Sequence, residues 1–361
     1  MCIGETSFIP FRNEKGQVNT IFEDASEHLE TIFSSYVNLR ERPIQNCAIV
    51  SMKDRTPQWS LKDGDQDTVQ KNTLLLFLAA VAENEYLSHV SSYANASMFQ
   101  LYWQRFSIPP EYLAIESRRR DGSTTDGGYK HGEVKFPIPR EASSPFGISI
   151  DKDFCDGLSR ALSADLQIIK NILAAMSFFS LASTDSSFMR RDAETILMGS
   201  AFEQLFSTDG AYKLCKRFGE LFNSYGTVNV QRGLETRHGI QLDSRHEESQ
   251  KQWFMHQKWI EELYDLRSCY IHGEALKNRE WGWLPPEHLI MAAFVFPLVV
   301  KIMLSNEEFY TLSRREKGSC RAVDKLLAQT EWYEDNEDRN STNWQTILGE
   351  SRWNEAFEDE N

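Results

Sequence analysis

The longest apolar stretch of the chain, "HLIMAAFVFPLVVKIML" at residues 288–304, limits the available folds more than any other feature. It is shorter than the roughly 20 apolar residues with which a helix crosses a bilayer, and it contains Pro297 and Lys301. A helix that is apolar on every side is stable only when protein surrounds it. We therefore expect a buried core helix here, and we expect no membrane as a partner.

Apolar residues recur at helical spacing through most of the second half of the sequence, as in "AETILMGSAFEQLF". Asp185 and Asp209 are expected to be N-caps, and Pro286 fits the first turn of a helix. Residues 223–250 lack the pattern and are expected to form an extended connection. The expected helices cover 153–182, 185–207, 209–224, 245–276, 286–304 and 306–330.

The first 150 residues combine patterns of both kinds. A strong helical pattern covers 68–90, and a Gly-, Ser- and Thr-rich segment at 118–132 is expected to be a loop or the tip of a hairpin. The Pro- and Ser-rich segment 137–147 is a candidate linker. Short β-like runs bounded by turn residues cover 46–52, 111–120 and 131–139.

These patterns predict an α+β protein in three parts. Residues 1–145 would form a smaller mixed α/β domain. Residues 150–330 would form an all-α bundle. Residues 331–361 would form an acidic tail that contains aromatic residues.

Charge and cysteine usage point to the cytoplasm and do not exclude a nucleic-acid partner. The net charge is −14, and residues 331–361 carry 10 acidic against 2 basic residues, so the rest is near neutral and can hold a basic cleft. The 6 cysteines include no CxxC pair, which argues against a zinc ribbon or a disulfide framework. The N-terminus has no secretory signal pattern.

The tail allows two interpretations. Its aromatic residues, Trp332, Tyr333, Trp344, Trp353 and Phe357, could pack on the body of the protein while the acidic residues stay solvated. The acidic segment could instead compete with an anionic ligand for a basic site.

The segment "ELYDLRSCYIHGEAL" at 262–276 reads as a two-sided helix. At about 100° per residue, Asp265, Ser268 and His272 lie on one narrow stripe. Leu263, Leu266 and Tyr270 form a second stripe on roughly the opposite side, which is expected to face the core. Arg267 lies between the two stripes, about 140° from His272 on an ideal helix. Gly273 favours a bend or a helix end directly after the histidine.

An imidazole and a guanidinium suit a specific reaction that needs no metal. The imidazole accepts or donates a proton near neutral pH, and the guanidinium offers forked donors that match a phosphate. Together they can promote attack of a ribose 2′-hydroxyl on the adjacent phosphate, which gives a 2′,3′-cyclic phosphate and a 5′-hydroxyl. The plain alternative is that Arg267 forms a structural salt bridge or interacts with the helix end.

The same segment resembles the signature helix of the HEPN superfamily, and more narrowly that of its Apea-like branch. Members carry an arginine, then four to six intervening residues, then a histidine, often in an "LYDLR…HG" context. Upstream, "RRDAETILMGSAFEQLFS" resembles the family's helix with an acidic position, which places Glu203 at that position. The resemblance covers roughly residues 155–330.

The resemblance implies an all-α HEPN bundle that forms a homodimer and acts as a metal-independent ribonuclease, with no cofactor. Arg267 and His272 would be the catalytic pair. Relatives of this kind serve in toxin–antitoxin pairs and anti-phage defence, so the implied partners are RNA, a second copy and an antitoxin or phage-derived trigger. Where the family usually has Asn, Asp or His after the arginine, this chain has Ser268, which can hydrogen-bond but carries no charge.

Several further residues are candidates for supporting roles. Asp265 and Ser268 share the stripe of His272, and Glu203 is expected to orient a partner such as Arg267. The basic residues of the Gly-rich segment, Arg118, Arg119, Arg120 and Lys130, are candidate RNA contacts.

The aromatic residues around His256, namely Trp253 and Trp259, could stack on bases or could pack in the core or a dimer interface. The rival functions are therefore a non-cleaving nucleotide- or RNA-binding module, a protein-interaction module, and a purely structural bundle.

Overall fold

The structure is a computed structural model of the 361-residue chain. It describes residues 1–12, 16–37, 41–44, 47–52, 64–85, 87, 93–103, 105–106, 111–118, 120–121, 124–130, 132–137, 148–184, 188–230, 253–273, 276, 280–328 and 343–357.

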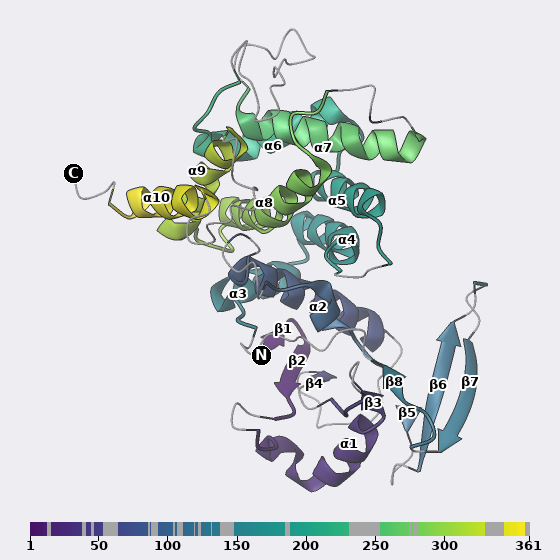
Figure 1. The fold of residues 1–361 in the computed structure, drawn as a ribbon. Helices are drawn as coiled ribbons and strands as arrows, with labels where there is room; N and C mark the ends of the chain where they lie inside the picture. The colour runs from purple at the N-terminus through teal and green to yellow at the C-terminus, as the bar shows by residue number, and fades with distance from the viewer. Residues whose placement is uncertain are drawn as a thin grey trace. The chain divides into compact units, whose positions relative to one another are not determined.

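The chain forms two compact units, each of which is described by itself. Unit 1 comprises Met1–Thr73 and Ser97–Pro145, and unit 2 comprises Leu74–Ala96 and Phe146–Asn361. Strands lie in unit 1 and most helices lie in unit 2 (Figure 1). The predicted α+β composition, with strands towards the N-terminus and a helical C-terminal region, is thus confirmed at this coarse level.

The described residues of unit 1 form three small β-sheets and a short α-helix. Strands β1 (Cys2–Ile3), β2 (Thr6–Pro10) and β4 (Ala48–Met52) form an antiparallel sheet in the order β1-β2-β4. Strand β3 (Tyr36–Val37) pairs in parallel with β8 (Phe136–Pro137). The 3-10 helix η1 (Thr20–Ala25) leads into α1 (Ser26–Phe33), whose Leu29 and Ile32 are buried.

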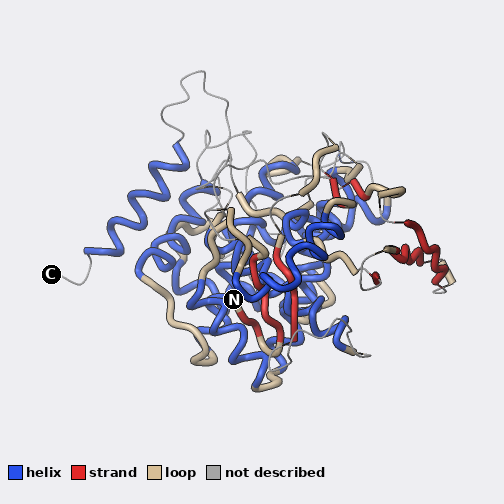
Figure 2. Tube along the Cα trace, turned by 90° about the horizontal axis from the view of Figure 1, so that it is seen from below, coloured by secondary structure: helices blue, strands red, loops and turns tan. Residues whose placement is uncertain are grey.

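A third sheet joins β5 (Arg105–Phe106), β6 (Tyr112–Arg118) and β7 (Thr124–Lys130), all antiparallel; Figure 2 shows strands in red. The prediction of strands at 46–52 and 111–120 is confirmed by β4 and β6. The prediction of a loop or hairpin tip over 118–132 is wrong for Thr124–Lys130, which form strand β7 and pair with β6; a hairpin is present, but its tip is limited to the residues between Arg118 and Thr124. Cross-strand pairing outweighed the local glycine content.

Helix α2 (Asp65–Glu83) contains the boundary between the two units and begins and ends earlier than the predicted 68–90. In its unit 1 part, the Asn72 side chain donates to the carbonyl of Ile3 at 3.0 Å and to the hydroxyl of Thr6 at 2.7 Å. These buried bonds fix the first strands to the helix. A short 3-10 helix, η2 (Ala96–Phe99), follows. The candidate linker 137–147 lies almost wholly outside the described residues.

Unit 2 is helical through most of its described length. Helix α5 packs against α4, α7 and α8, and α7 packs against α6 and α9 (Figure 1). The helices are α3 (Lys152–Ser163), α4 (Gln167–Ala182), α5 (Arg191–Phe206), α6 (Ala211–Phe222), the 3-10 helix η3 (Asn223–Tyr225), α7 (Met255–His272), α8 (Pro285–Asn306), α9 (Arg314–Ala328) and α10 (Asn343–Phe357).

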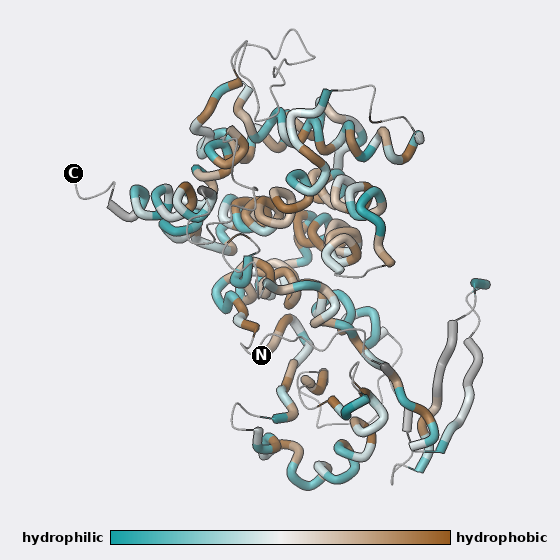
Figure 3. The backbone as a smooth tube through the Cα atoms, in the orientation of Figure 1, coloured by the Kyte–Doolittle hydropathy of each residue, from teal (hydrophilic) through white to brown (hydrophobic). Residues whose placement is uncertain are grey.

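Helix α8 is the central helix of this unit, as the opening stretch predicted. By length and composition it could cross a membrane, but 72% of its apolar window is buried inside the protein. Its brown, hydrophobic segments lie among other helices (Figure 3). Phe296 stacks on Phe179 of α4, with ring centroids 4.3 Å apart. This burial confirms that α8 is a core helix. Pro285 and Pro286 occupy its first turn, where the sequence predicted Pro286.

Two differences between the structure and the predicted helix boundaries have a clear physical reason. Residues 153–182 form two helices bent by 117°, with Asp165 at φ 50° between them. Asp can adopt this left-handed conformation at modest cost, and the periodicity did not reveal it. Asp209 is not an N-cap, because Gly210 occupies that position and Asp209 pairs with Lys213 instead. Asp185 and residues 231–252 lie outside the described residues.

A buried polar cluster fixes the start of α7. Both carboxylate oxygens of Asp324 on α9 accept backbone N–H groups, from His256 at 2.8 Å and from Thr227 at 2.8 Å. The His256 ring bonds Asp324 at 2.8 Å through Nδ1 and Asn223 at 2.9 Å through Nε2. The carboxylate therefore satisfies donors that the first turn of a helix leaves open.

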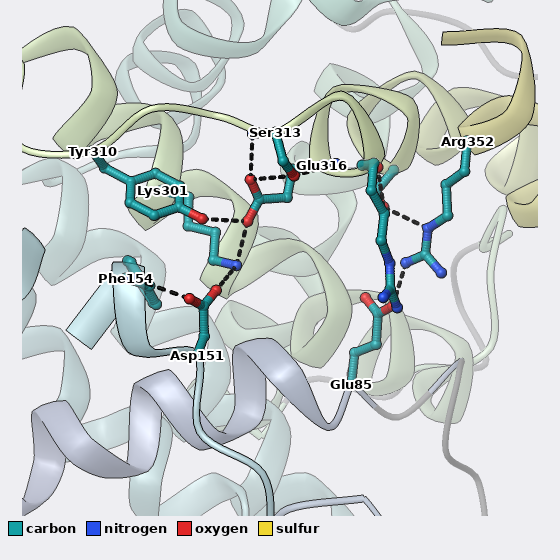
Figure 4. A network of polar contacts seen from close by, with 10 residues as sticks. Glu85, Asp151, Phe154, Lys301, Tyr310, Ser313, Glu316 and Arg352 are labelled. Atoms are coloured by element: carbon teal, nitrogen blue, oxygen red, sulfur yellow. Dashed lines mark hydrogen bonds and ion pairs between the residues drawn. The ribbon is translucent and has the colours of Figure 1, made fainter. Parts of the chain in front are cut away.

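A second buried cluster joins three helices around Lys301 (Figure 4). Its ammonium group contacts Asp151, the N-cap of α3, at 2.6 Å and Glu316 in the first turn of α9 at 2.5 Å. Burial alone would lower the pKa of Lys301, but the two carboxylates outweigh it and raise that pKa. Tyr310 and Ser313 donate to Glu316, so the cluster is fully hydrogen-bonded.

The C-terminal tail contains a helix, which supports the first of its two interpretations. Helix α10 packs on α9, where Trp344 and Leu348 are buried while Trp353 is 67% exposed. Arg352 pairs with Glu85 (Figure 4). Trp332 and Tyr333 lie outside the described residues.

We predict that Lys301→Met lowers the free energy of unfolding by about 3–5 kcal/mol, because it leaves two buried carboxylates without their cation. Urea unfolding at neutral pH measures this change. Lys170→Met is the matched control, since it removes an exposed ion pair with Asp165 and should change the free energy by less than about 0.5 kcal/mol. Equal stability of the two variants would contradict the role assigned to Lys301.

Candidate functional site

Helix α7 has the two faces that its sequence predicts, except that Tyr270, expected to face the core, is only half-buried. Leu263 and Leu266 are buried, whereas Asp265 and Ser268 are half-buried. The helix ends at His272, because Gly273 adopts the left-handed conformation at φ 69° and its N–H bonds the carbonyl of Cys269. A residue without a Cβ adopts this conformation without strain, so the sequence signal for a helix end here is confirmed.

Arg267 lies against helix α5 and is held there by three contacts. Its Nη2 atom pairs with Glu203 Oε2 at 2.7 Å, and its Cζ lies 5.6 Å from the ring centroid of Tyr264. Its aliphatic stem runs over Gly199, where a Cβ would lie 3.0 Å from the Arg267 Cβ. The side chain remains 22% exposed, so the guanidinium is anchored without being sealed from solvent.

Glu203 is the buried member of the pair, with 10% of its side chain exposed. Burial raises the pKa of Glu203 above its ordinary value, the Arg267 charge opposes that rise, and the nearby Asp209 charge adds to it. Burial thus acts on the pKa of Glu203 more strongly than the guanidinium does. The ion pair at 2.7 Å holds the end of Arg267 against α5.

His272 is exposed at the last position of α7. In the part of unit 2 that the structure describes, no hydrogen bond or ion pair joins Arg267 to His272. The guanidinium is instead turned towards α5, as the wide angle between the two positions on the helix allows. Both side chains project from the last turn and a half of one helix, and both reach solvent.

The predicted supporting residues divide into two groups. Glu203 contacts Arg267 as expected, and Asp265 and Ser268 lie on the partly exposed face that leads to His272. The basic residues of the hairpin belong to unit 1. Among them Arg120 and Lys130 are exposed, Arg118 ends strand β6, and Arg119 lies outside the described residues.

The interpretation of Trp253, His256 and Trp259 as a base-stacking surface is wrong, and the packing interpretation is confirmed. Trp259 and His256 are fully buried, and Trp253 is 8% exposed. Trp259 packs edge-on to Phe202 of α5, and His256 is bound by Asp324 as described above. These rings fix α7 on its neighbours and present no face to a ligand.

Sequence reasoning did not single out two residues that shape the surroundings of Arg267. Gly199 lies four residues before Glu203, and Tyr264 lies three before Arg267, so each pair shares a helix face. The sequence could have indicated Gly199, because it is a small residue one helical turn before the acidic position Glu203. Within the described residues, no group of three or more metal-ligating side chains comes together.

No family model, curated protein or solved structure matches the chain. The geometry of α5 and α7 therefore carries the functional argument.

We predict that the Glu203 carboxyl titrates above the ordinary glutamate range and that Arg267→Met raises its pKa further, because the opposing positive charge is lost. ¹³C NMR of glutamate side chains measures both midpoints. A raised pKa means that the folded state binds the proton more tightly than the unfolded state. Glu203 thus contributes stability at low pH that is lost as pH rises through its folded pKa.

The control for this titration is Lys216→Met, which removes an exposed cation on α6 that pairs with Glu220. It should leave the Glu203 midpoint where it is. An unchanged midpoint in Arg267→Met would show that the guanidinium does not act on this carboxylate in solution.

Proposed function

We propose that this chain is a metal-independent endoribonuclease of the HEPN type. The observation that carries the proposal is the end of α7, where a guanidinium fixed on α5 and an exposed imidazole both reach solvent from one short stretch of helix. The sequence resemblance of this helix and of α5 to the HEPN signature, which rests on the same residues, also supports the proposal.

In this proposal the two side chains act on one RNA phosphate. His272 accepts the proton of the ribose 2′-hydroxyl as its oxygen attacks the phosphorus, and the bond to the 5′-oxygen breaks. The leaving oxygen takes a proton from water or from the histidine of a second copy. Arg267 stabilises the charge that develops on the phosphoryl oxygens. The products are a 2′,3′-cyclic phosphate and a 5′-hydroxyl, and DNA is not a substrate.

The proposal extends to the setting in which such an enzyme works. A cytoplasmic toxin or anti-phage effector would act as a homodimer through its helical unit, with an antitoxin or a phage-derived trigger as regulator. Unit 1 would sense the trigger, bind a partner or position RNA, with Arg120 and Lys130 as exposed cations on its hairpin.

A second candidate function is a HEPN module that binds RNA or a nucleotide without cutting it. Two observations favour it. Ser268 stands where the family usually has Asn, Asp or His, and Arg267 is already engaged by Glu203. A guanidinium held in this way could bind a phosphate while the chemical step stays slow.

We predict that the purified protein cleaves a mixed RNA pool in EDTA and leaves 2′,3′-cyclic phosphate ends. Arg267→Ala and His272→Ala should each reduce cleavage by about a hundredfold or more. End-specific labelling of the products measures this. Arg190→Ala, which removes an arginine side chain that is 83% exposed, should cleave like the wild type.

The outcomes separate the candidate functions. RNA binding without cleavage, weakened in Arg267→Ala, would replace the nuclease by the binding module. Loss of thermal stability in both variants, with no RNA bound or cut by the wild type, would leave a structural bundle. Growth arrest on induction of the wild type, and its absence with His272→Ala, would support the toxin role.

A further inference from the structure

Gly199 allows helix α5 to approach the stem of Arg267 unusually closely. A Cβ at this position would lie 3.0 Å from the Cβ, 3.1 Å from the Cγ and 3.4 Å from the Cδ of Arg267. All three contacts fall on the side chain of one residue, so a larger residue at position 199 requires that side chain to move by a few tenths of an ångström. Gly is also the residue that helices tolerate least after proline, so its presence here has a cost that Ala would remove.

Two more contacts restrict the Arg267 side chain, which stays partly exposed. Glu203, one turn along α5 from Gly199, pairs with the end of the guanidinium at 2.7 Å. Tyr264, one turn back along α7, places its ring 5.6 Å from the guanidinium carbon. The Nε atom is buried and makes no hydrogen bond to a described residue. The α5 backbone at Gly199 thus restricts the stem of Arg267. The Glu203 carboxylate restricts the end of its guanidinium, and the Tyr264 ring restricts the face.

We propose that Gly199 and Tyr264 are positioning residues for Arg267. Gly199 has no side chain, so the aliphatic stem of Arg267 can lie directly against α5. Tyr264 restricts the orientation of the guanidinium by a cation–π contact. The inference about catalysis rests on the proposed function, whereas the inference about the position of Arg267 does not. Fixing an arginine side chain costs conformational entropy. Here that cost is incurred when the protein folds, so binding of the phosphate does not incur it again.

The first experiment measures the position of Arg267 independently of any activity. In protein labelled with ¹⁵N-arginine, the Nε–H signal of Arg267 is assigned by its absence in Arg267→Lys. Because this group is enclosed, we expect a signal that exchanges slowly with water. Gly199→Ala should shift it or make its exchange fast. Gly349→Ala is the matched control, since this glycine of α10 has no atom within 4 Å of an added Cβ.

The second experiment measures RNA cleavage by the same variants. Gly199→Ala should lower kcat by roughly tenfold to a hundredfold with little change in KM, as expected for a misplaced transition-state contact. Tyr264→Leu should lower kcat about fivefold, and Tyr264→Phe, which retains the ring face, should restore it. Gly349→Ala should match the wild type. Gly199→Ala should stay folded, because the higher helix propensity of Ala offsets part of the cost of moving Arg267, and its melting temperature is measured alongside kcat.

The results separate this inference from the proposed function. If Gly199→Ala leaves both the Arg267 signal and kcat at wild-type values, the positioning role is overturned while the nuclease stands. If the wild type cuts no RNA but Gly199→Ala and Tyr264→Leu alter the Arg267 signal, the nuclease fails while the positioning role stands. Equal signals in Tyr264→Leu and the wild type would overturn the role of the ring.

Discussion

The ion pair between Glu203 and Arg267 is the contact on which the candidate site depends. It joins α5 to α7 at the point where α7 changes from a core helix to a solvent-facing one. Towards the start of α7, Trp259 and Leu263 are buried in the core. Towards its end, His272 is exposed. Arg267 lies between these regions, and without an anchor a side chain of this length would sample many orientations.

Two ion pairs of unit 2 differ in how burial and charge balance. Burial raises the pKa of Glu203 more than the Arg267 charge lowers it. Elsewhere in unit 2, Lys301 behaves in the opposite way, since Asp151 and Glu316 raise its pKa despite its burial. The ammonium group of Lys301 is buried between its two carboxylates, whereas Arg267 stays 22% exposed beside Glu203.

The periodicity and spacing of residue types predicted those structural features that depend on residues close together in the sequence. The two faces of α7, its end at Gly273 and the burial of α8 all follow from short-range patterns. What depends on partners distant in sequence was not predictable. The carboxylate of Asp324 that starts α7 comes from α9, and the stem of Arg267 lies on Gly199 of α5. Strand β7 was missed for the same reason, because its partner strand outweighs its glycines.

A double-mutant cycle in urea unfolding tests most directly whether this pair positions the arginine. It uses the wild type, Glu203→Gln, Arg267→Met and the combined variant, at a pH above the raised pKa of Glu203. We predict a coupling energy of about 1–3 kcal/mol in favour of the pair, as found for charged side chains in contact. Effects of the single changes that add to within about 0.3 kcal/mol would contradict the account, because Arg267 would then have no anchor on α5.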